Sequence, residues 1–249
     1  MEAVFRTDVG KLREHNEDAG DLFYKEDMIL AIVADGMGGH RAGDVASEMA
    51  VKALKDAWDH HPPKNEYGAI KRWLTEEIQR ANDAVFQKSI ADESYRGMGT
   101  TLVASVIYEG GLVIGHVGDS RAYRLQPPSM VQLTSDHSLV NELVKSGQLK
   151  PEEAENHPRK NVVTRALGTQ AEVEVEVGYY EFPKQSTLLL CSDGLSDKLL
   201  EKDIEETLLG DREIDGSADA LVQKALERGG EDNITVLLVY HNVDGEGHP

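Results

Sequence analysis

Short runs of apolar residues, some alternating with polar ones, recur along the chain and predict β-strands. Alternation is typical of a strand with one buried face, and an uninterrupted apolar run is typical of a strand buried on both faces. The expected strands span 3–7, 28–34, 100–108, 112–117, 121–125, 131–134, 173–182, 187–192 and 234–241. The stretch "VIYEGGLVIG" predicts a hairpin that turns at Gly110 and Gly111.

Other segments repeat apolar residues at the spacing of one helix face. These stripes are Val45, Met49, Ala53, Leu54 and Ala57, then Ile70, Trp73, Leu74, Ile78, Ala81 and Val85, and finally Leu221, Val222, Ala225 and Leu226. Strands and helices do not alternate regularly, so a doubly wound parallel sheet is disfavoured. We expect an α+β fold of antiparallel sheets flanked by helices, in a single domain over residues 1–249. Residues 137–168 are polar and predict a flap of helix and loop.

Two of the expected strands end in Asp-Gly, in "ILAIVADGMGG" (29–39) and in "TLLLCSDGL" (187–195). Asp-Gly is a favoured hairpin turn, and a hairpin requires a second strand directly after the turn. After Asp35 and Asp193 the chain instead continues as loop and helix. These aspartates therefore mark strand ends, and Gly36 leaves its own carbonyl free to turn toward an ion.

Acidic residues stand beside other strands as well. If these strand ends meet, crowded carboxylates in a partly buried site retain their protons unless cations neutralise them. Oxygen ligands without a cluster of Cys or His favour Mg²⁺ or Mn²⁺ over zinc. One Asp-Gly alone is more often a turn than a ligand, so the prediction depends on the recurrence. The residues are Glu17 and Asp18, expected in a loop, and Asp35, Asp119, Asp193 and Asp232 at strand ends, with Asn233 beside the last.

Two hard cations held close together generate hydroxide and stabilise in-line displacement at phosphorus. A phosphate dianion also pairs with a guanidinium, and Arg13 stands three residues before Asn16. Arg13 could equally be a surface arginine that pairs with neighbouring acids.

The sequence lacks the residues that other kinds of phosphate chemistry require. Six positions after Cys191 is Asp197, where a cysteine phosphatase needs arginine, and no G-x-x-x-x-G-K-[ST] loop occurs.

The charge balance narrows the range of partners. The chain has 26 Lys and Arg against 45 Asp and Glu, a formal net charge of -19. Such a surface repels nucleic-acid backbones and anionic membranes, so we expect neither nucleic-acid binding nor membrane insertion. Cys191 is the single cysteine, and neither a signal sequence nor a membrane-spanning run occurs. These features predict a cytoplasmic protein.

Eight stretches, taken in order, resemble the metal-dependent protein phosphatase 2C (PPM) family, particularly its bacterial PrpC/Stp-like serine/threonine phosphatases. They are "REHNED" (13–18), "VADGMGGHRAGDVAS" (33–47), "GMGTT" (97–101), "GHVGDSRAY" (115–123), "LTSDHSLV" (133–140), "HPRKNVVTRALG" (157–168), "LLLCSDGL" (188–195) and "GGEDNITVLLV" (229–239). The resemblance implies a four-layer α/β/β/α sandwich with a two-metal site of Mn²⁺ or Mg²⁺ at one edge, and in some members a third ion.

The resemblance also implies a role for each site residue. Asp35 bridges both ions, the Gly36 carbonyl binds the first, and Asp193 and Asp232 bind the second; Asp18 and Glu17 hold metal-bound water, Arg13 takes the substrate phosphate, and Asp119 shares the third ion with Asp193, with Asp197 assisting. The water that bridges the two ions is the nucleophile, and no phosphoenzyme forms.

One position departs from the animal members of the family, because their Asp-Gly-His is Asp35-Gly36-Met37 here. Methionine cannot donate a proton to the leaving group. We favour a metal-bound water near Asp119 as the donor, and His40 is the alternative.

The resemblance implies hydrolysis of phosphoserine and phosphothreonine in proteins by a monomer that opposes a bacterial Ser/Thr kinase. One alternative is a phosphatase-like binding module without catalysis, which would lack some of the acids. Another is an acidic cation-binding protein without phosphate chemistry. In the flap, the basic residues His157, Arg159, Lys160 and Arg165 either contact the phosphosubstrate or pair with Glu152, Glu153 and Glu155.

Overall fold

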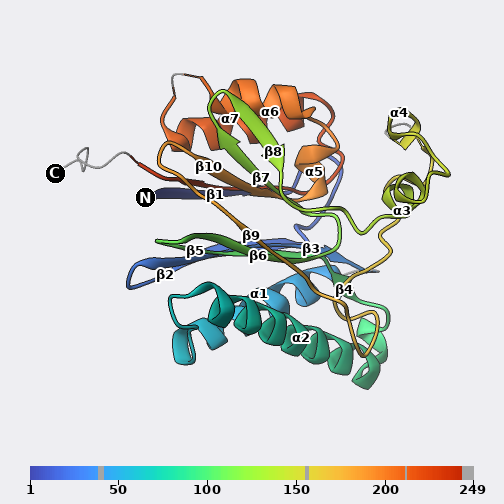
Figure 1. Ribbon diagram of the computed structural model, residues 1–249. Coiled ribbons are helices and arrows are strands. Elements are labelled where there is room, and N and C mark those ends of the chain that lie inside the picture. Colours follow the sequence, from blue (N-terminus) through green and yellow to red (C-terminus); the bar gives the residue numbers. More distant parts are fainter. Residues whose placement is uncertain (39–41, 155–156, 211, 243–249) are drawn as a thin grey trace.

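Two antiparallel sheets face each other and form the centre of the molecule (Figure 1). The computed structural model describes residues 1–38, 42–154, 157–210 and 212–242. The first sheet has the order β1 (Glu2–Asp8), β11 (Ile234–Tyr240), β10 (Thr187–Cys191), β7 (Arg121–Gln126) and β8 (Ser129–Gln132). The second has the order β2 (Asp18–Lys25), β3 (Met28–Met37), β5 (Leu102–Tyr108), β6 (Gly111–Val117) and β9 (Glu176–Tyr180), with β4 (Gly99–Thr100) paired to β3.

Helices cover the outer face of each sheet, so the expected α/β/β/α sandwich is confirmed (Figure 1). The second sheet is covered by α1 (Ala42–His60) and α2 (Tyr67–Ala91), which the short 3₁₀ helix η1 (Glu93–Tyr95) follows. The first sheet is covered by α5 (Asp193–Ser196), α6 (Glu201–Leu208) and α7 (Ile214–Glu227). Within residues 137–168, α3 (Leu139–Lys145) and α4 (Pro151–Ala154) form the flap beside the sandwich. No helix among the described residues is both apolar enough and long enough to span a membrane.

The central strands are apolar on both faces because each face packs against a different layer. In β3, Ile29 and Val33 lie in the core between the sheets, whereas Leu30 and Ile32 pack against α1 and α2. In β10, Leu189 instead faces the layer that contains α7. Side chains alternate between the faces of a strand, so an uninterrupted apolar run fills two cores at once.

Several element boundaries differ from the expectations, and two differences bear on the site. β3 does not end before Asp35 but continues through Asp35 and Gly36 to Met37, because Gly36 and Met37 pair with β4. Asp18 is not in a loop, because it is the first residue of β2. The segment "DAGDLFYK" is an edge strand whose mixed polar and apolar residues do not alternate cleanly, so its pattern gave no strand signal. The strand expected over 100–108 is interrupted at Thr101, and the one expected over 173–182 is limited to β9.

Candidate active site

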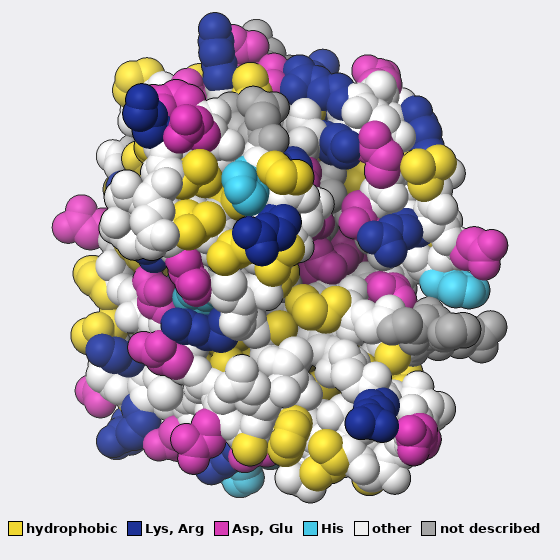
Figure 2. All heavy atoms as spheres, turned by 90° about the vertical axis from the view of Figure 1, so that its right-hand side faces the viewer, with side chains coloured by type: hydrophobic (Ala, Val, Ile, Leu, Met, Phe, Trp, Pro, Cys, Tyr) yellow, Lys and Arg dark blue, Asp and Glu magenta, His cyan; other side chains and the backbone are white. Residues whose placement is uncertain are grey.

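Antiparallel pairing brings the predicted acids to one end of the sandwich. Asp18 opens β2 directly opposite Asp35 of β3, so the two residues are partners in the ladder. Asp193 follows β10, and Asp232 precedes the neighbouring strand β11. Asp119 follows β6. Figure 2, which faces the flap side of Figure 1, shows acidic side chains recessed in a hollow of this surface.

Burial and mutual repulsion raise the pKa values of the carboxyl groups in this cluster. Desolvation, and then the charges of the four other aspartates, raise the pKa of Asp35 well above its ordinary value. The pKa of Asp18 and that of Asp119 each rise to about 7, mainly through burial and in both cases with a contribution from Asp193. Burial, and then the charge of Asp232, raise the pKa of Asp193 to about 6. Without a cation, the cluster is therefore partly protonated near neutral pH.

The residues present fit a hard divalent cation. Asp18 Oδ1 is buried and has no hydrogen-bond partner among the described residues, whereas Asp18 Oδ2 accepts a hydrogen bond from Ser192 Oγ at 2.7 Å. A Cβ at Gly36 would lie 2.1 Å from the Gly43 carbonyl oxygen and 2.5 Å from that of Glu17. Only glycine fits this narrow space. Because Gly36 has no side chain, the backbone beside the carboxylates is free of side-chain atoms. A set of carboxylate and carbonyl oxygens is the donor set that Mg²⁺ and Mn²⁺ prefer.

Hydroxyl groups that the sequence did not single out fix the backbone of the acidic residues. Thr100 Oγ1 donates to the Asp35 carbonyl oxygen at 2.9 Å, and the Asp35 amide donates to Thr101 Oγ1 at 3.0 Å. Thr101 Oγ1 also hydrogen-bonds Ser120 Oγ, next to Asp119, at 2.7 Å. The motif "GMGTT" contains both threonines, but spacing alone gave no sign of which groups they contact.

Asn233 secures the N-terminal loop rather than facing the carboxylates. Its Oδ1 accepts a hydrogen bond from the Glu17 amide at 2.8 Å, and its Nδ2 donates to the carbonyl oxygens of Val9 and His15. The Glu17 carboxylate lies beside Gly43, where an added Cβ would approach it to 2.7 Å. Desolvation raises the pKa of Glu17, so this acid also belongs to the crowded region.

Arg13 lies at the edge of the cluster and pairs with one of the acids. Its Nη2 is 2.8 Å from Asp232 Oδ2, and the two side chains are 48% and 36% exposed. The sequence left two roles open for Arg13, binding of the substrate phosphate and pairing with neighbouring acids. The contact observed is the ion pair with Asp232. Asp197 is bound to Lys160 of the flap at 2.8 Å. His40 lies outside the described residues.

The base of the flap is fastened next to Asp119. Arg121 forms a forked ion pair with Asp136, with Nε at 3.0 Å and Nη2 at 2.7 Å from Oδ2. Among the described residues, the basic flap side chains do not pair with Glu152 or Glu153; Lys160 pairs with Asp197, and Arg165 pairs with Glu174 at 2.9 Å. Glu155 lies outside the described residues.

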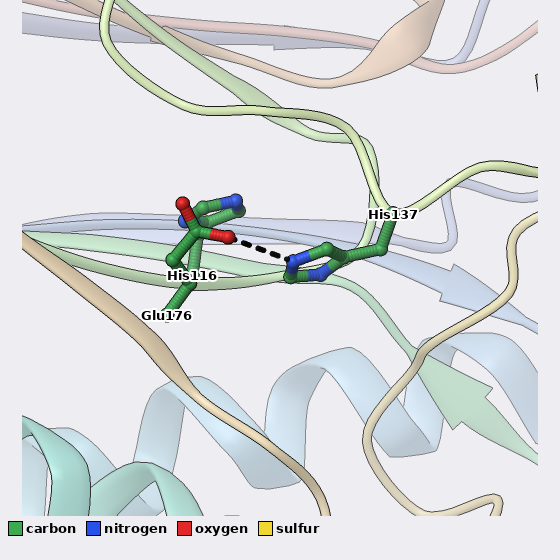
Figure 3. Close-up of side chains that lie close together, drawn as sticks. All are labelled: His116, His137 and Glu176. Carbon is green, nitrogen blue, oxygen red and sulfur yellow. Dashed lines mark hydrogen bonds and ion pairs between the residues drawn. The ribbon is translucent and has the colours of Figure 1, made fainter. Parts of the chain in front are cut away.

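A second cluster, His116, His137 and Glu176, lies beside the flap base (Figure 3). Its candidate ligand atoms lie within 4.8 Å of one another, and the imidazole rings stack at 4.7 Å. The Gly118 amide donates to His137 Nδ1 at 3.0 Å, and His137 Nε2 lies 3.4 Å from Glu176 Oε2 and 3.3 Å from Arg165 Nη1. The Nδ1 lone pair is therefore already used, and the positive charge of Arg165 beside Nε2 disfavours a metal cation there. Burial, with His116 and Arg165 nearby, lowers the pKa of His137 to about 4, which keeps the ring neutral.

Comparisons with known proteins identify the family of this chain. The family model described as "Protein phosphatase 2C" matches residues 13–228. The chain belongs to the protein phosphatase 2C family. It is 49% identical to the serine/threonine phosphatase stp of Listeria welshimeri over 99% of this chain and 98% of that one. It is 41% identical to protein phosphatase PhpP of Streptococcus pneumoniae over 97% of this chain and 98% of that one.

Solved structures of this phosphatase family have the same fold. The serine/threonine phosphatase of S. agalactiae superimposes with a TM-score of 0.91 at 40% identity, covering 96% of this chain and 98% of that one. The phosphatase PstP/Ppp of Mycobacterium tuberculosis gives a TM-score of 0.88 at 36% identity, covering 97% and 99%. The suspected family membership is therefore confirmed.

Replacing Ser192 by alanine tests how this phosphatase-family site holds Asp18. The Ser192 hydroxyl donates to Asp18 and accepts from the buried Thr235 amide at 3.0 Å. Loss of both bonds should lower the free energy of unfolding by about 1–3 kcal/mol. Urea denaturation measures this, with Ser105→Ala as the control, because the buried Ser105 hydroxyl has no partner among the described residues. Equal losses in both variants would contradict the assignment.

The crowded carboxyls also predict that cations displace protons. A carboxyl with a raised pKa stabilises the metal-free fold below its ordinary pKa of about 3.9, and this contribution is lost as pH rises through about 6 to 7. Calorimetric titration with Mn²⁺ in buffers of different ionisation enthalpy should therefore show proton release at about pH 6.5 and less at about pH 8.5. The same heat in every buffer at the lower pH would count against shared protonation of the cluster.

Proposed function

We propose that this serine/threonine protein phosphatase hydrolyses phosphoserine and phosphothreonine in proteins with two divalent cations, Mn²⁺ or Mg²⁺. The observation that carries the proposal is the convergence of five mutually repelling aspartates with one adjacent arginine. The names of the relatives, which match nearly the whole chain, support the same substrate class.

Each acid has a position suited to holding an ion. Asp35 interacts with all four other aspartates, so its carboxylate is best placed to be shared by two cations. Asp193 follows β10 and Asp232 precedes the adjacent strand β11, so both would hold the second cation, and Gly36 would offer its carbonyl to the first. Asp18 and Glu17 would support the ions from the edge. When bound, such a pair of cations supplies hydroxide at neutral pH and stabilises charge during in-line displacement at phosphorus.

Arg13 is the residue that we assign to the phosphate group. Its ion pair with Asp232 is partly exposed on both sides, and exposed pairs contribute only about 0–1 kcal/mol. The guanidinium can therefore exchange the Asp232 carboxylate for a phosphate dianion, which accepts two parallel hydrogen bonds. This exchange would orient the phosphate at the edge of the acid cluster. It would also free the Asp232 carboxylate to bind a cation.

Asp119 is the acid that we place nearest the leaving oxygen, where it would share a third ion with Asp193, with Asp197 nearby. Met37 has no proton to donate, so protonation of the departing serine or threonine oxygen depends on Asp119 and what it binds. In the metal-free site, burial raises the pKa of Asp119 to about 7, and a bound cation would relieve this buried charge.

A binding module without catalysis is not favoured, because every acid of the family pattern is present. Opposition to a Ser/Thr kinase follows from the proposed substrate class. The monomeric state, the cytoplasmic location and the single-domain boundary over residues 1–249 stay predictions of the sequence.

Phosphate release from a phosphothreonine peptide tests the proposed function. Purified protein with Mn²⁺ should release phosphate, and excess chelator should abolish release. Asp35→Asn should lower kcat/KM by at least about a hundredfold, because one shared ligand is lost from both ions. Asp215→Asn is the matched control, since Asp215 lies on α7, is 62% exposed and pairs with Arg6 instead of with a residue of the acid cluster. Metal-independent turnover, or none by any preparation, would refute the proposal.

Asp119→Ala separates leaving-group chemistry from phosphate binding. A serine or threonine alkoxide is a poor leaving group and needs a proton, whereas an aryl oxide leaves without one. The variant should therefore lose at least about tenfold more activity on a phosphopeptide than on an aryl phosphate. Steady-state kinetics on both substrates measure the ratio, and equal losses would contradict the role of Asp119.

A further inference from the structure

A deep cleft leads away from the acid cluster between the flap and the helices α5 and α6. Its volume is about 920 Å³, and both Asp119 and Asp193 line it. The cleft is therefore continuous with the candidate active site. A phosphorylated side chain that reaches these acids belongs to a peptide, and the peptide must leave the site along the surface. This cleft offers such a path for one of its two flanks.

Two ion pairs join charged side chains that line the cleft. Lys160 of the flap binds Asp197 at the end of α5, and Arg121 binds Asp136 at the flap base. These pairs cross from one structural unit to another and hold the flap against the body. Because they neutralise one another locally, they offer little basis for selecting a charged peptide side chain.

The walls of the cleft also carry apolar side chains from both sides. On the flap they are Val140 and Val144 of α3 and Ala154 of α4; on the opposite side they are Leu199 and Leu200, which precede α6. Leu200 is 67% exposed. When an apolar group of a bound peptide fills the space between these two apolar walls, water is excluded and the free energy of binding becomes more favourable.

We propose that this cleft is a subsite for the peptide beside the phosphorylated residue, and that it selects a substrate with an apolar side chain at one fixed flanking position. The inference rests on the proposed function, because the continuity of the cleft with the acids identifies the occupant as substrate. Val144 and Leu200 are the side chains that contact the apolar residue from opposite walls. They act on specificity and take no part in the chemistry.

A set of phosphothreonine peptides tests the subsite, each with leucine or serine at one flanking position and otherwise identical. With Mn²⁺, the protein should prefer leucine over serine at one position by about tenfold in kcat/KM. In Leu200→Ser and in Val144→Ser this preference should fall to about twofold, while hydrolysis of an aryl phosphate stays unchanged. Serine is neutral, so neither variant adds charge beside the carboxylates.

Leu209→Ser is the matched control, because Leu209 is 43% exposed at the other end of α6 and does not line the cleft. This variant should keep the full preference, and thermal melts should show that all three variants remain folded. Equal turnover of every peptide, or the same loss in Leu209→Ser, would overturn the subsite and leave the proposed function intact. Aryl phosphate turnover without hydrolysis of any phosphopeptide would refute the proposed function, and the subsite with it.

Discussion

Repulsion among carboxylates is the constraint on which the candidate active site depends. Five aspartates from both sheets meet at one end of the sandwich, and burial raises the pKa of Asp18 and of Asp119 to about 7. Protons relieve this repulsion in the metal-free protein, and divalent cations relieve it more completely. The same arrangement therefore costs stability in the metal-free protein and favours the binding of cations.

Apolar packing in the layers of the sandwich offsets the unfavourable free energy of the acid cluster, because the cores lie away from the cluster. Strands such as β3 and β10 fill apolar layers on both faces, and only their ends carry acids. Hydroxyl groups from Thr100, Thr101 and Ser192 then hold the acidic segments by hydrogen bonds to backbone and carboxylate. Substrate selection is assigned to the adjoining cleft, where the flap meets α5 and α6.

Much of this could be predicted from the sequence, because apolar runs and Asp-Gly strand ends are local signals. The sheets, the helices and the set of acids were expected, and the fold confirms the layers. Edge strand β2 was missed, since its polar and apolar residues do not alternate. The contacts of Ser192, and the His116–His137 stack, join residues far apart in sequence, so no spacing along the chain reveals them. The partner of Arg13 also depends on tertiary geometry.

Anomalous diffraction at the manganese edge, from crystals grown with Mn²⁺ at neutral pH, tests the central claim most directly. The account predicts manganese peaks enclosed by Asp35, Asp193 and Asp232, with the Gly36 carbonyl oxygen directed at one of them. An acid cluster without manganese at saturating Mn²⁺, or manganese bound only at His116, His137 and Glu176, would contradict it.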